Sequence, residues 1–320
     1  MTQLLSVNDL NVSFPVEKYI FKAVRGISLA LTTGSVLALV GESGSGKTMT
    51  ALSVMRLVPQ PGFISSGNII FEGQSLLALP EKELRSIRGR RMSMVFQEPM
   101  TSLNPVLRIA DQLTEPLLLH SGMSRRDAEE RSVELLANVG IPSAGNRMRD
   151  YPHQLSGGMR QRVMIAMALA CHPSLLIADE PTTALDVTIQ AQILELLDLQ
   201  RKTGGLSILL ITHDLGIVAE RADHTAIMYA GQVVESAPTA TLLAAPRHPY
   251  TEALLVSLPQ NAEPGRPLPT MPGQLNIRVA HADGCSFAER CPLAEGSCRS
   301  EQQLLREIAP SHTVRCWKCS

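Results

Sequence analysis

The sequence predicts an α/β fold built on a parallel β-sheet, and three apolar runs indicate it. The run Val36–Val40 leads into the glycine-rich loop GESGSGKT, Gly41–Thr48. A second run, Leu175–Ala178, ends in two acidic residues, and a third occupies Ile208–Thr212. Short apolar runs bounded by turns are typical of strands that are buried on both faces. The loops after such strands lie at the carboxyl edge of the sheet, where α/β proteins bind their ligands.

The loop Gly41–Thr48 has the pattern of a phosphate-binding site. An apolar strand precedes it, and a helix-like segment through Val58 follows it. Backbone N–H groups of such a loop converge on one phosphate cluster at the positive end of a helix. The ammonium of Lys47 would reach the outer phosphates, and the hydroxyl of Thr48 would ligate Mg²⁺. The sequence therefore predicts a nucleotide site here.

A second helix start with exposed N–H groups is expected at Ser156–Gly158. Its serine is a good N-cap, and the segment Gln161–Ala170 is apolar at helical intervals. Alone, this pattern indicates only a capped helix, but the acidic strand end follows it. There, Asp179 would support the Mg²⁺ shell, and Glu180 would polarise a water for attack on the γ-phosphate.

Helical patterns fill most of the chain between these motifs. The segment from Gln97 to about Leu169 is mostly helical, with a clear amphipathic stretch at Arg125–Gly140, and predicts a helical subdomain. Asp186 is a candidate N-cap for a helix that runs to about Arg201. We expect residues 1–245 to form one α/β domain with this subdomain at about 97–169.

After residue 245 the composition changes. Seven prolines between Pro246 and Pro272 surround a short helix-like stretch, Tyr250–Ser257. This density of proline predicts a loop-rich extension, 246–320, without a large core. Five of the six cysteines lie in it: Cys285, Cys291, Cys298, Cys316 and Cys319. The sixth, Cys171, is expected to be a buried small hydrophobic residue.

The clustered cysteines suggest a metal site, because disulfides are disfavoured in a cytosolic protein. Soft thiolates suit zinc or an iron–sulfur cluster. Their spacing matches neither the usual zinc-finger pattern nor the ferredoxin pattern, so metal ligands and reduced structural cysteines both stay open. His281 and His312 are further zinc candidates, although surface histidines are the simpler interpretation.

Composition narrows the class of protein. The chain has 29 Lys and Arg against 30 Asp and Glu, so its net charge of −1 gives no global attraction to nucleic acid. A hydrophobic content of 44% allows a substantial core. The longest apolar stretch, Val163–Ala178, is interrupted by His172-Pro173-Ser174 and is not expected to span a bilayer. We see no secretory signal and expect a cytosolic protein that meets membranes through partners.

Six motifs in order resemble those of the ATP-binding subunits of ABC transporters, over nearly the whole chain. The matches are Gly41–Thr48 with the Walker A loop, Gln97 with the Q-loop, Leu155–Gln161 with the signature motif, Leu175–Glu180 with Walker B, Ala184–Asp186 with the D-loop and His213 with the switch histidine. Taken singly, Gln97 would be a surface glutamine, His213 a loop histidine and Asp186 an N-cap. The ordered set favours the nucleotide role.

The resemblance implies ATP, Mg²⁺ and hydrolysis shared between two subunits. The signature motif would complete the ATP site of a partner, Gln97 would link Mg²⁺ and water to the helical subdomain, and His213 would contact the γ-phosphate. Catalysis would rest on Lys47, Gln97, Glu180 and His213, and Mg²⁺ on Thr48, Gln97 and Asp179. The implied nucleotide contacts are Phe14, Gly41, Glu42, Ser43, Gly44, Ser45, Gly46, Lys47, Thr48, Met49, Gln97, Ser156, Gly157, Gly158, Gln161, Asp179 and Asp186. Phe14 would stack on adenine, with Tyr19 and Phe21 as alternatives.

The C-terminal segments Pro246–Thr251, Gly284–Phe287, Arg290–Pro292 and Val314–Trp317 resemble the extension of oligopeptide and dipeptide importer ATPases. In some members of that family four such cysteines hold a [4Fe–4S] cluster. The resemblance gives this role to Cys285, Cys291, Cys298 and Cys316, with Zn²⁺ as the alternative metal. Cys319 forms a CxxC pair with Cys316 and is the spare.

This second resemblance implies an ATPase that drives import of di- or oligopeptides from the cytoplasmic face of the inner membrane. Its partners would be a second ATPase subunit, identical or different, two transmembrane permease subunits and an extracytoplasmic solute-binding protein, without nucleic acid. Glu98–Pro105 resembles the loop that docks a permease helix. The alternatives are another solute, such as nickel or a peptide-like compound, and a non-transport ABC ATPase that acts on DNA or ribosomes.

Overall fold

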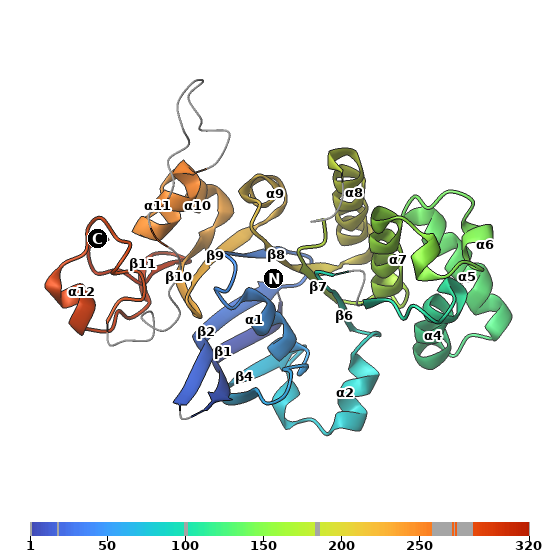
Figure 1. Cartoon of the computed structure of the whole chain (residues 1–320), viewed down its shortest axis with the longest axis horizontal. Coiled ribbons are helices and arrows are strands. Elements are labelled where there is room, and N and C mark those ends of the chain that lie inside the picture. The colour runs from blue at the N-terminus through green and yellow to red at the C-terminus, as the bar shows by residue number, and fades with distance from the viewer. Residues whose placement is uncertain are drawn as a thin grey trace. The chain divides into compact units, whose positions relative to one another are not determined.

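The computed structural model describes residues 2–17, 19–98, 102–182, 186–257, 271, 273 and 284–319 (Figure 1). The chain divides into two compact units. The P-loop unit comprises Leu5–Ala30, Val36–Leu77 and Ile211–Ser320, and the helical unit comprises Met1–Leu4, Leu31–Ser35 and Ala78–Leu210. Both parallel and antiparallel strand pairs occur, which confirms the predicted α/β class.

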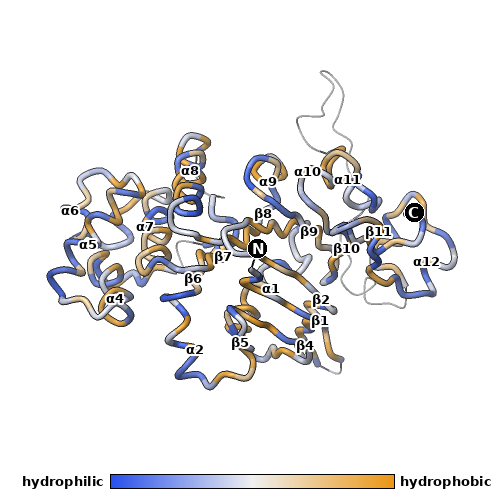
Figure 2. The backbone as a smooth tube through the Cα atoms, turned by 180° about the vertical axis from the view of Figure 1, so that it is seen from behind, coloured by the Kyte–Doolittle hydropathy of each residue, from blue (hydrophilic) through white to orange (hydrophobic). Residues whose placement is uncertain are grey.

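The P-loop unit contains an antiparallel sheet near its N-terminus. Its strands are β1 (Gln3–Val16), β2 (Tyr19–Thr32), β4 (Phe63–Phe71) and β5 (Gln74–Ser75), in the order β2-β1-β4-β5. Leu5 of β1 lies opposite Phe71 of β4, and Ser13 lies opposite Phe63. Hydrophobic and hydrophilic residues alternate along β1 (Figure 2), as expected for a sheet with one buried face.

The same unit holds the strand that precedes the glycine-rich loop. This strand, β3 (Val36–Val40), is buried along its whole length and pairs in parallel with β9 (His224–Tyr229). Beyond β9 follow β10 (Gln232–Pro238), β12 (His312–Val314) and β11 (Arg306–Ala309), in that order. Two strands of the C-terminal extension therefore continue the sheet that carries β3.

Five helices accompany these strands in the described part of the P-loop unit. They are α1 (Lys47–Val54), α9 (Leu215–Arg221), α10 (Thr239–Ala244), α11 (Pro249–Val256) and α12 (Gly296–Ser300). The short helix expected at Tyr250–Ser257 is confirmed as α11. Helix α1 ends at Val54 and not at Val58, because Arg56 leaves the helix with a φ of 51°.

The C-terminal extension also contributes to the core of this unit. Tyr250 and Phe287 are 0% and 1% exposed and pack with Val40 of β3 and Tyr229 of β9 in one hydrophobic cluster. The ring centroid of Tyr229 lies 4.7 Å from that of Tyr250 and 5.2 Å from that of Phe287, edge to face. The extension, predicted as loop-rich without a large core, thus shares the core around β3. The domain boundary at residue 245 stays a prediction.

The helical unit is built around a second group of strands. In it, β6 (Met92–Val95) pairs in parallel with β7 (Leu175–Asp179), and β8 (Ser207–Thr212), whose last two residues belong to the P-loop unit, lies next to β7. Its helices are α2 (Glu81–Ile87), α4 (Ile109–Ser121), α5 (Arg125–Asn138), α6 (Ala144–Arg147), α7 (Gly157–Leu169) and α8 (Val187–Gly204).

Helices α5 and α8 of this unit begin where the sequence predicts. The amphipathic stretch at 125–140 is α5, which starts at the N-cap Ser124. Helix α8 starts at the predicted N-cap Asp186, whose carboxylate accepts from the N–H of Ile189 at 2.9 Å, and it runs past Arg201 to Gly204. Within the described ranges, no helix combines the length and apolarity needed to cross a membrane.

Candidate functional site

The glycine-rich loop packs so closely on its neighbours that two of its positions admit only glycine. A Cβ atom at Gly41 would lie 2.2 Å from the carbonyl oxygen of Met228 in β9. Gly46 has a φ of +104°, and a Cβ there would lie 2.6 Å from the carbonyl oxygen of Ala23 in β2. Both positions exclude larger residues, so the backbone of the loop is held in place by β2 and β9.

The ammonium of Lys47 is hydrogen-bonded to backbone oxygens of the loop. Its Nζ donates to the carbonyl oxygens of Gly41 at 2.7 Å and of Glu42 at 2.9 Å, and the residue is 7% exposed. The hydroxyl of Ser45 is buried and has no hydrogen-bond partner among the described residues. A buried polar atom without a partner calls for a ligand. Phosphate oxygens would satisfy both groups, and the exposed Thr48 leaves a place for Mg²⁺.

In the helical unit, the predicted catalytic residues Gln97 and Glu180 meet. The amide nitrogen of Gln97 donates to Oε2 of Glu180 at 3.2 Å. Asp179 ends β7 with 1% exposure, and Glu180 follows with a φ of 47°. A left-handed conformation in a residue other than glycine costs free energy, so the surrounding structure must hold Glu180 in it. The strand end therefore presents Glu180 and Gln97 together.

The signature segment forms the start of α7. The hydroxyl of Ser156 accepts from the N–H of Met159 at 3.3 Å. Ser156 and Gly158 line a pocket of about 400 Å³ together with Asp186. Gln161 is 1% exposed and donates to the carbonyl oxygen of Pro181 at 2.7 Å. Its amide nitrogen thus bonds inside the protein, next to the acidic end of β7.

His213 and Phe14 lie in the P-loop unit. His213 is exposed directly after β8, and the next residue, Asp214, caps α9 by accepting from the N–H of Gly216 at 2.8 Å. A Cβ atom at Gly62 would lie 2.4 Å from the ring of Phe14, so this ring rests directly on the backbone. Tyr19, the alternative adenine platform, is 49% exposed. Ala184 and Leu185 of the D-loop lie outside the described residues.

Four cysteines of the extension line one small cavity. Cys285, Cys291, Cys298 and Cys316 surround a space of about 20 Å³, roughly the room that one water molecule needs. All four are free thiols. The described residues contain no group of three or more His, Cys, Asp or Glu side chains at metal-binding geometry. The cavity nevertheless brings together the four cysteines that the sequence singles out.

Burial disfavours ionisation of thiols in the extension. Burial, together with the smaller effects of the neighbouring cysteines Cys316, Cys291 and Cys298, raises the pKa of Cys285 to about 11. When ionised, the four cysteines would be soft ligands of the kind that zinc and iron–sulfur clusters take. Burial also raises the pKa of the spare, Cys319, to about 12.

The remaining metal candidates have other roles or lie outside the described residues. His312 is 4% exposed, and its Nε2 lies 2.9 Å from Oε1 of the buried Glu235, so it is not a surface histidine. His281 lies outside the described residues. Cys171 is half-buried, and not fully buried as expected.

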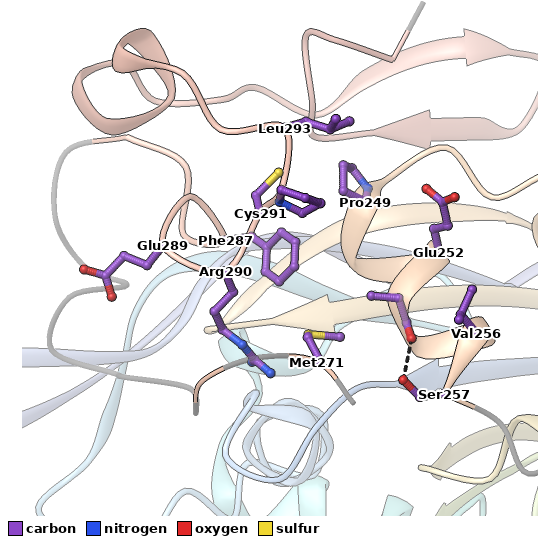
Figure 3. A pocket seen from close by; sticks show the side chains of 12 residues that line it. Pro249, Glu252, Val256, Ser257, Met271, Phe287, Glu289, Arg290, Cys291 and Leu293 are labelled. Atoms are coloured by element: carbon purple, nitrogen blue, oxygen red, sulfur yellow. Dashed lines mark hydrogen bonds between the residues drawn. The ribbon is translucent and has the colours of Figure 1, made fainter. Parts of the chain in front are cut away.

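Two residues of the C-terminal motifs contact the phosphate loop, a role that the sequence did not predict for them. Tyr250 accepts from the backbone N–H of Glu42 at 3.0 Å, and Arg290 forms an ion pair with the carboxylate of Glu42. They follow Glu42 by 208 and 248 residues, so no local pattern pairs them with it. Figure 3 shows Arg290 with Phe287 and Cys291 on a loop that faces α11 across a pocket of about 630 Å³.

Comparisons with known proteins agree with this geometry. The family model for ABC transporters matches residues 24–183, and the model for the oligopeptide/dipeptide transporter C-terminal region matches residues 234–298. The dipeptide transport ATP-binding protein DppD of Escherichia coli K12 is 48% identical over 98% of this chain and 96% of its own. The oligopeptide transport ATP-binding protein AppD of Bacillus subtilis 168 is 51% identical over 99% of this chain and 97% of its own.

A solved structure supports the same assignment. The ATP-binding cassette MJ0796, a dimer in a post-hydrolysis state with ADP and Pi, is similar with a TM-score of 0.68 and 26% identity. The match covers 74% of this chain and 99% of the cassette. The chain therefore belongs to the ABC transporter family, as the ATP-binding and ATP-hydrolysing subunit of an oligopeptide/dipeptide-type transporter.

Proposed function

We propose that the chain powers the import of di- or oligopeptides across the cytoplasmic membrane, bound peripherally at its cytoplasmic face. The observation that carries this proposal is the C-terminal region. The oligopeptide/dipeptide transporter model matches it over residues 234–298, and the relatives named for dipeptide and oligopeptide transport align along almost the whole chain. A general ABC ATPase would need only the part that precedes it.

The proposed chemistry begins at the phosphate loop. Incoming phosphate oxygens would accept from the ammonium of Lys47, and the loop N–H groups and the Ser45 hydroxyl would complete the phosphate site. Thr48, Gln97 and Asp179 are the proposed ligands of Mg²⁺, which would neutralise charge on the β- and γ-phosphates. Phe14 is the proposed platform for adenine.

Hydrolysis is proposed to depend on Glu180. Its carboxylate would accept a proton from the attacking water, and the hydrogen bond from Gln97 would hold it in place. His213 would contact the γ-phosphate. The signature residues Ser156, Gly157 and Gly158, with Gln161 and Asp186, would complete the site of a second ATPase subunit. The dimeric state of MJ0796 supports such pairing, and the sister subunit is proposed to be a different chain.

The helical unit offers a surface for a membrane partner. Phe96, Val106 and Leu107 are 38%, 76% and 41% exposed, and they flank the segment predicted to dock a permease helix. Pro99, Met100 and Thr101 of that segment lie outside the described residues. We propose that a permease helix docks here, within a complex that contains two permease subunits, and that an extracytoplasmic solute-binding protein delivers the peptide.

The four cysteines that share one cavity are the proposed ligands of a [4Fe–4S] cluster. A cluster would supply a structural cross-link for a short extension, without a redox role. Ultraviolet–visible spectra of anaerobically purified protein test this, and broad absorption from the cluster is expected. A colourless sample with stoichiometric zinc would assign the same cysteines to zinc instead.

The partner assignment is tested by affinity purification of this chain from native membranes. We expect two membrane permeases, a second ATPase subunit and a periplasmic or extracellular binding protein to co-purify. Recovery of ribosomal or DNA-repair proteins in place of permeases would contradict the import role.

A further inference from the structure

We propose that the C-terminal extension positions the phosphate loop through Arg290 and Tyr250 and thereby sets the affinity for nucleotide. The inference rests on the membership of the chain in the ABC ATPase family. It requires neither the peptide cargo nor a metal at the cysteines.

The first contact is a two-pronged ion pair. Arg290 donates from Nη1 to Oε2 of Glu42 at 2.8 Å and from Nη2 to Oε1 at 3.0 Å. The side chain of Arg290 is 7% exposed and that of Glu42 is 29% exposed, so solvent screens the pair less than a surface pair. The hydrogen bonds to Glu42 raise the pKa of Arg290 above its usual range. Paired hydrogen bonds of this kind fix direction as well as distance.

The second contact is a hydrogen bond to the backbone of the same residue, Glu42. The N–H of Glu42 donates to Oη of Tyr250 at 3.0 Å, and Tyr250 is fully buried. The ring of Tyr229 lies edge to face with Tyr250, and the guanidinium carbon of Arg290 lies 5.8 Å from the centroid of that ring. Tyr250 and Arg290, the two residues that contact Glu42, therefore both pack against the ring of Tyr229.

These contacts act on the residue that holds the phosphate-binding lysine. The carbonyl oxygen of Glu42 accepts from Nζ of Lys47 at 2.9 Å. The N–H, the carboxylate and the carbonyl of Glu42 are thus all engaged, the first two by the extension and the third by Lys47. Releasing the extension would free Glu42 to move and with it the start of the phosphate loop.

Arg290, which pairs with Glu42, lies on the loop that also carries two of the clustered cysteines. Phe287 and Arg290 lie between Cys285 and Cys291, as Figure 3 shows for Phe287, Arg290 and Cys291. The N–H of Cys285 donates to the carbonyl oxygen of Cys298 at 2.7 Å, which ties this loop to the rest of the extension. A change in the conformation of the extension is therefore expected to change the conformation of the phosphate loop. Such coupling is reciprocal by thermodynamic linkage.

Binding of a fluorescent ATP analogue to the purified full chain tests the proposal. Arg290→Ala and Tyr250→Phe should each weaken binding by about tenfold, with kcat at saturating ATP retained because the catalytic groups are untouched. Arg299→Ala, which removes an exposed arginine from α12, is the matched control and should bind like the wild type. Glu42→Gln combined with Arg290→Ala should cost less than the sum of the two single changes.

Thermal unfolding without nucleotide separates positioning from stability. If Arg290→Ala and Tyr250→Phe lower the melting temperature but the folded fraction binds the analogue with wild-type affinity, the role is structural and the proposal is overturned. Tyr250→Phe keeps the buried ring and removes only the acceptor oxygen, so it reports on positioning even if Arg290→Ala folds poorly.

Hydrogen exchange tests the reciprocal effect in the wild type. ADP should slow exchange in residues 285–291, although these residues make no predicted contact with nucleotide. Unchanged exchange in the presence of bound ADP would overturn the coupling. Failure of the wild type to bind ADP would instead contradict the ATPase assignment itself.

Discussion

At the scale of single residues, the acidic end of β7 assigns different environments to two neighbouring carboxylates. Asp179 is enclosed at 1% exposure, whereas Glu180 turns out of the strand with a φ of 47° and receives a hydrogen bond from Gln97. An enclosed carboxylate suits a metal shell, and a less buried one beside a polar partner suits proton transfer. We therefore propose Glu180 as the general base.

Glu180→Gln should leave ATP binding intact and slow hydrolysis by about a thousandfold, because an amide cannot accept the proton of the attacking water. Phosphate release by the assembled transporter measures the effect. Glu195→Gln makes the same change at an exposed position of α8 and should hydrolyse ATP normally. Normal turnover by Glu180→Gln would remove Glu180 from the role of base.

The sequence identified the functional residues that belong to a short contiguous motif. Lys47 and Ser45 follow from the loop pattern, and the pairing of Gln97 with Glu180 is consistent with their predicted roles. Arg290 and Tyr250 could not be found in this way, because each contacts Glu42 only through tertiary packing. Their roles depend on contact with Glu42, which is distant in the sequence, and not on their neighbours in the sequence.

At the scale of elements, β10 carries a buried carboxylate that holds the extension in place. Glu235 is 0% exposed and accepts from the N–H groups of Arg247 and His248 at 2.8 and 2.9 Å, while Nε2 of His312 lies 2.9 Å away. Buried charge is tolerated only with such a full set of partners. The start of α11 and the strand β12 thus converge on one side chain.

This arrangement makes stability depend on pH through His248. Burial lowers its pKa from 6.5 to about 3 in the folded protein. The unfolded chain binds a proton below pH 6.5 and the folded chain does not, so this contribution is present above pH 6.5 and is lost as the pH falls toward 3. At pH 5 the loss amounts to about 2 kcal/mol, at 1.36 kcal/mol per pH unit.

His248→Asn keeps an acceptor for the N–H of Tyr250 and removes the titration. The stability difference between pH 7.5 and pH 5, measured by urea unfolding, should shrink by about 2 kcal/mol relative to the wild type. An equal pH dependence in both proteins would mean that His248 titrates normally in the fold.

Element boundaries were predictable where a cap marks them. Asp186 starts α8 as predicted, because its side chain accepts the hydrogen bond of the N–H of Ile189. The end of α1 was not predictable from apolar periodicity, because the backbone of Arg56 turns out of the helix while the side chains continue the pattern. The strands β11 and β12 join the sheet through long-range pairing with β10, which short windows of sequence do not encode.

At the scale of the whole molecule, the signature motif implies assembly. Gly157 begins α7, and a Cβ atom there would meet nothing within 4 Å in the single chain. A side chain at this position is therefore tolerated by the isolated subunit. A side chain added at Gly157 would contact only a molecule that binds in front of the start of α7.

Gly157→Asp should fold and bind ATP normally, yet its negative charge should repel the γ-phosphate held by the second ATPase subunit. In the Glu180→Gln background, ATP should produce a stable pair of ATPase subunits by light scattering, and adding Gly157→Asp should abolish it. Pairing that persists would show that the signature motif does not face a nucleotide.

Uptake of a labelled peptide measures directly whether ATP hydrolysis by this chain drives peptide import. The complex purified from native membranes is reconstituted into proteoliposomes with ATP on the side of the ATPase subunits and with the binding protein on the other. We expect peptide to accumulate with the wild-type chain and not with Lys47→Ala, whose phosphate loop lacks its ammonium. Equal uptake with both chains, or no ATP-dependent uptake of any peptide with the wild type, would contradict the account.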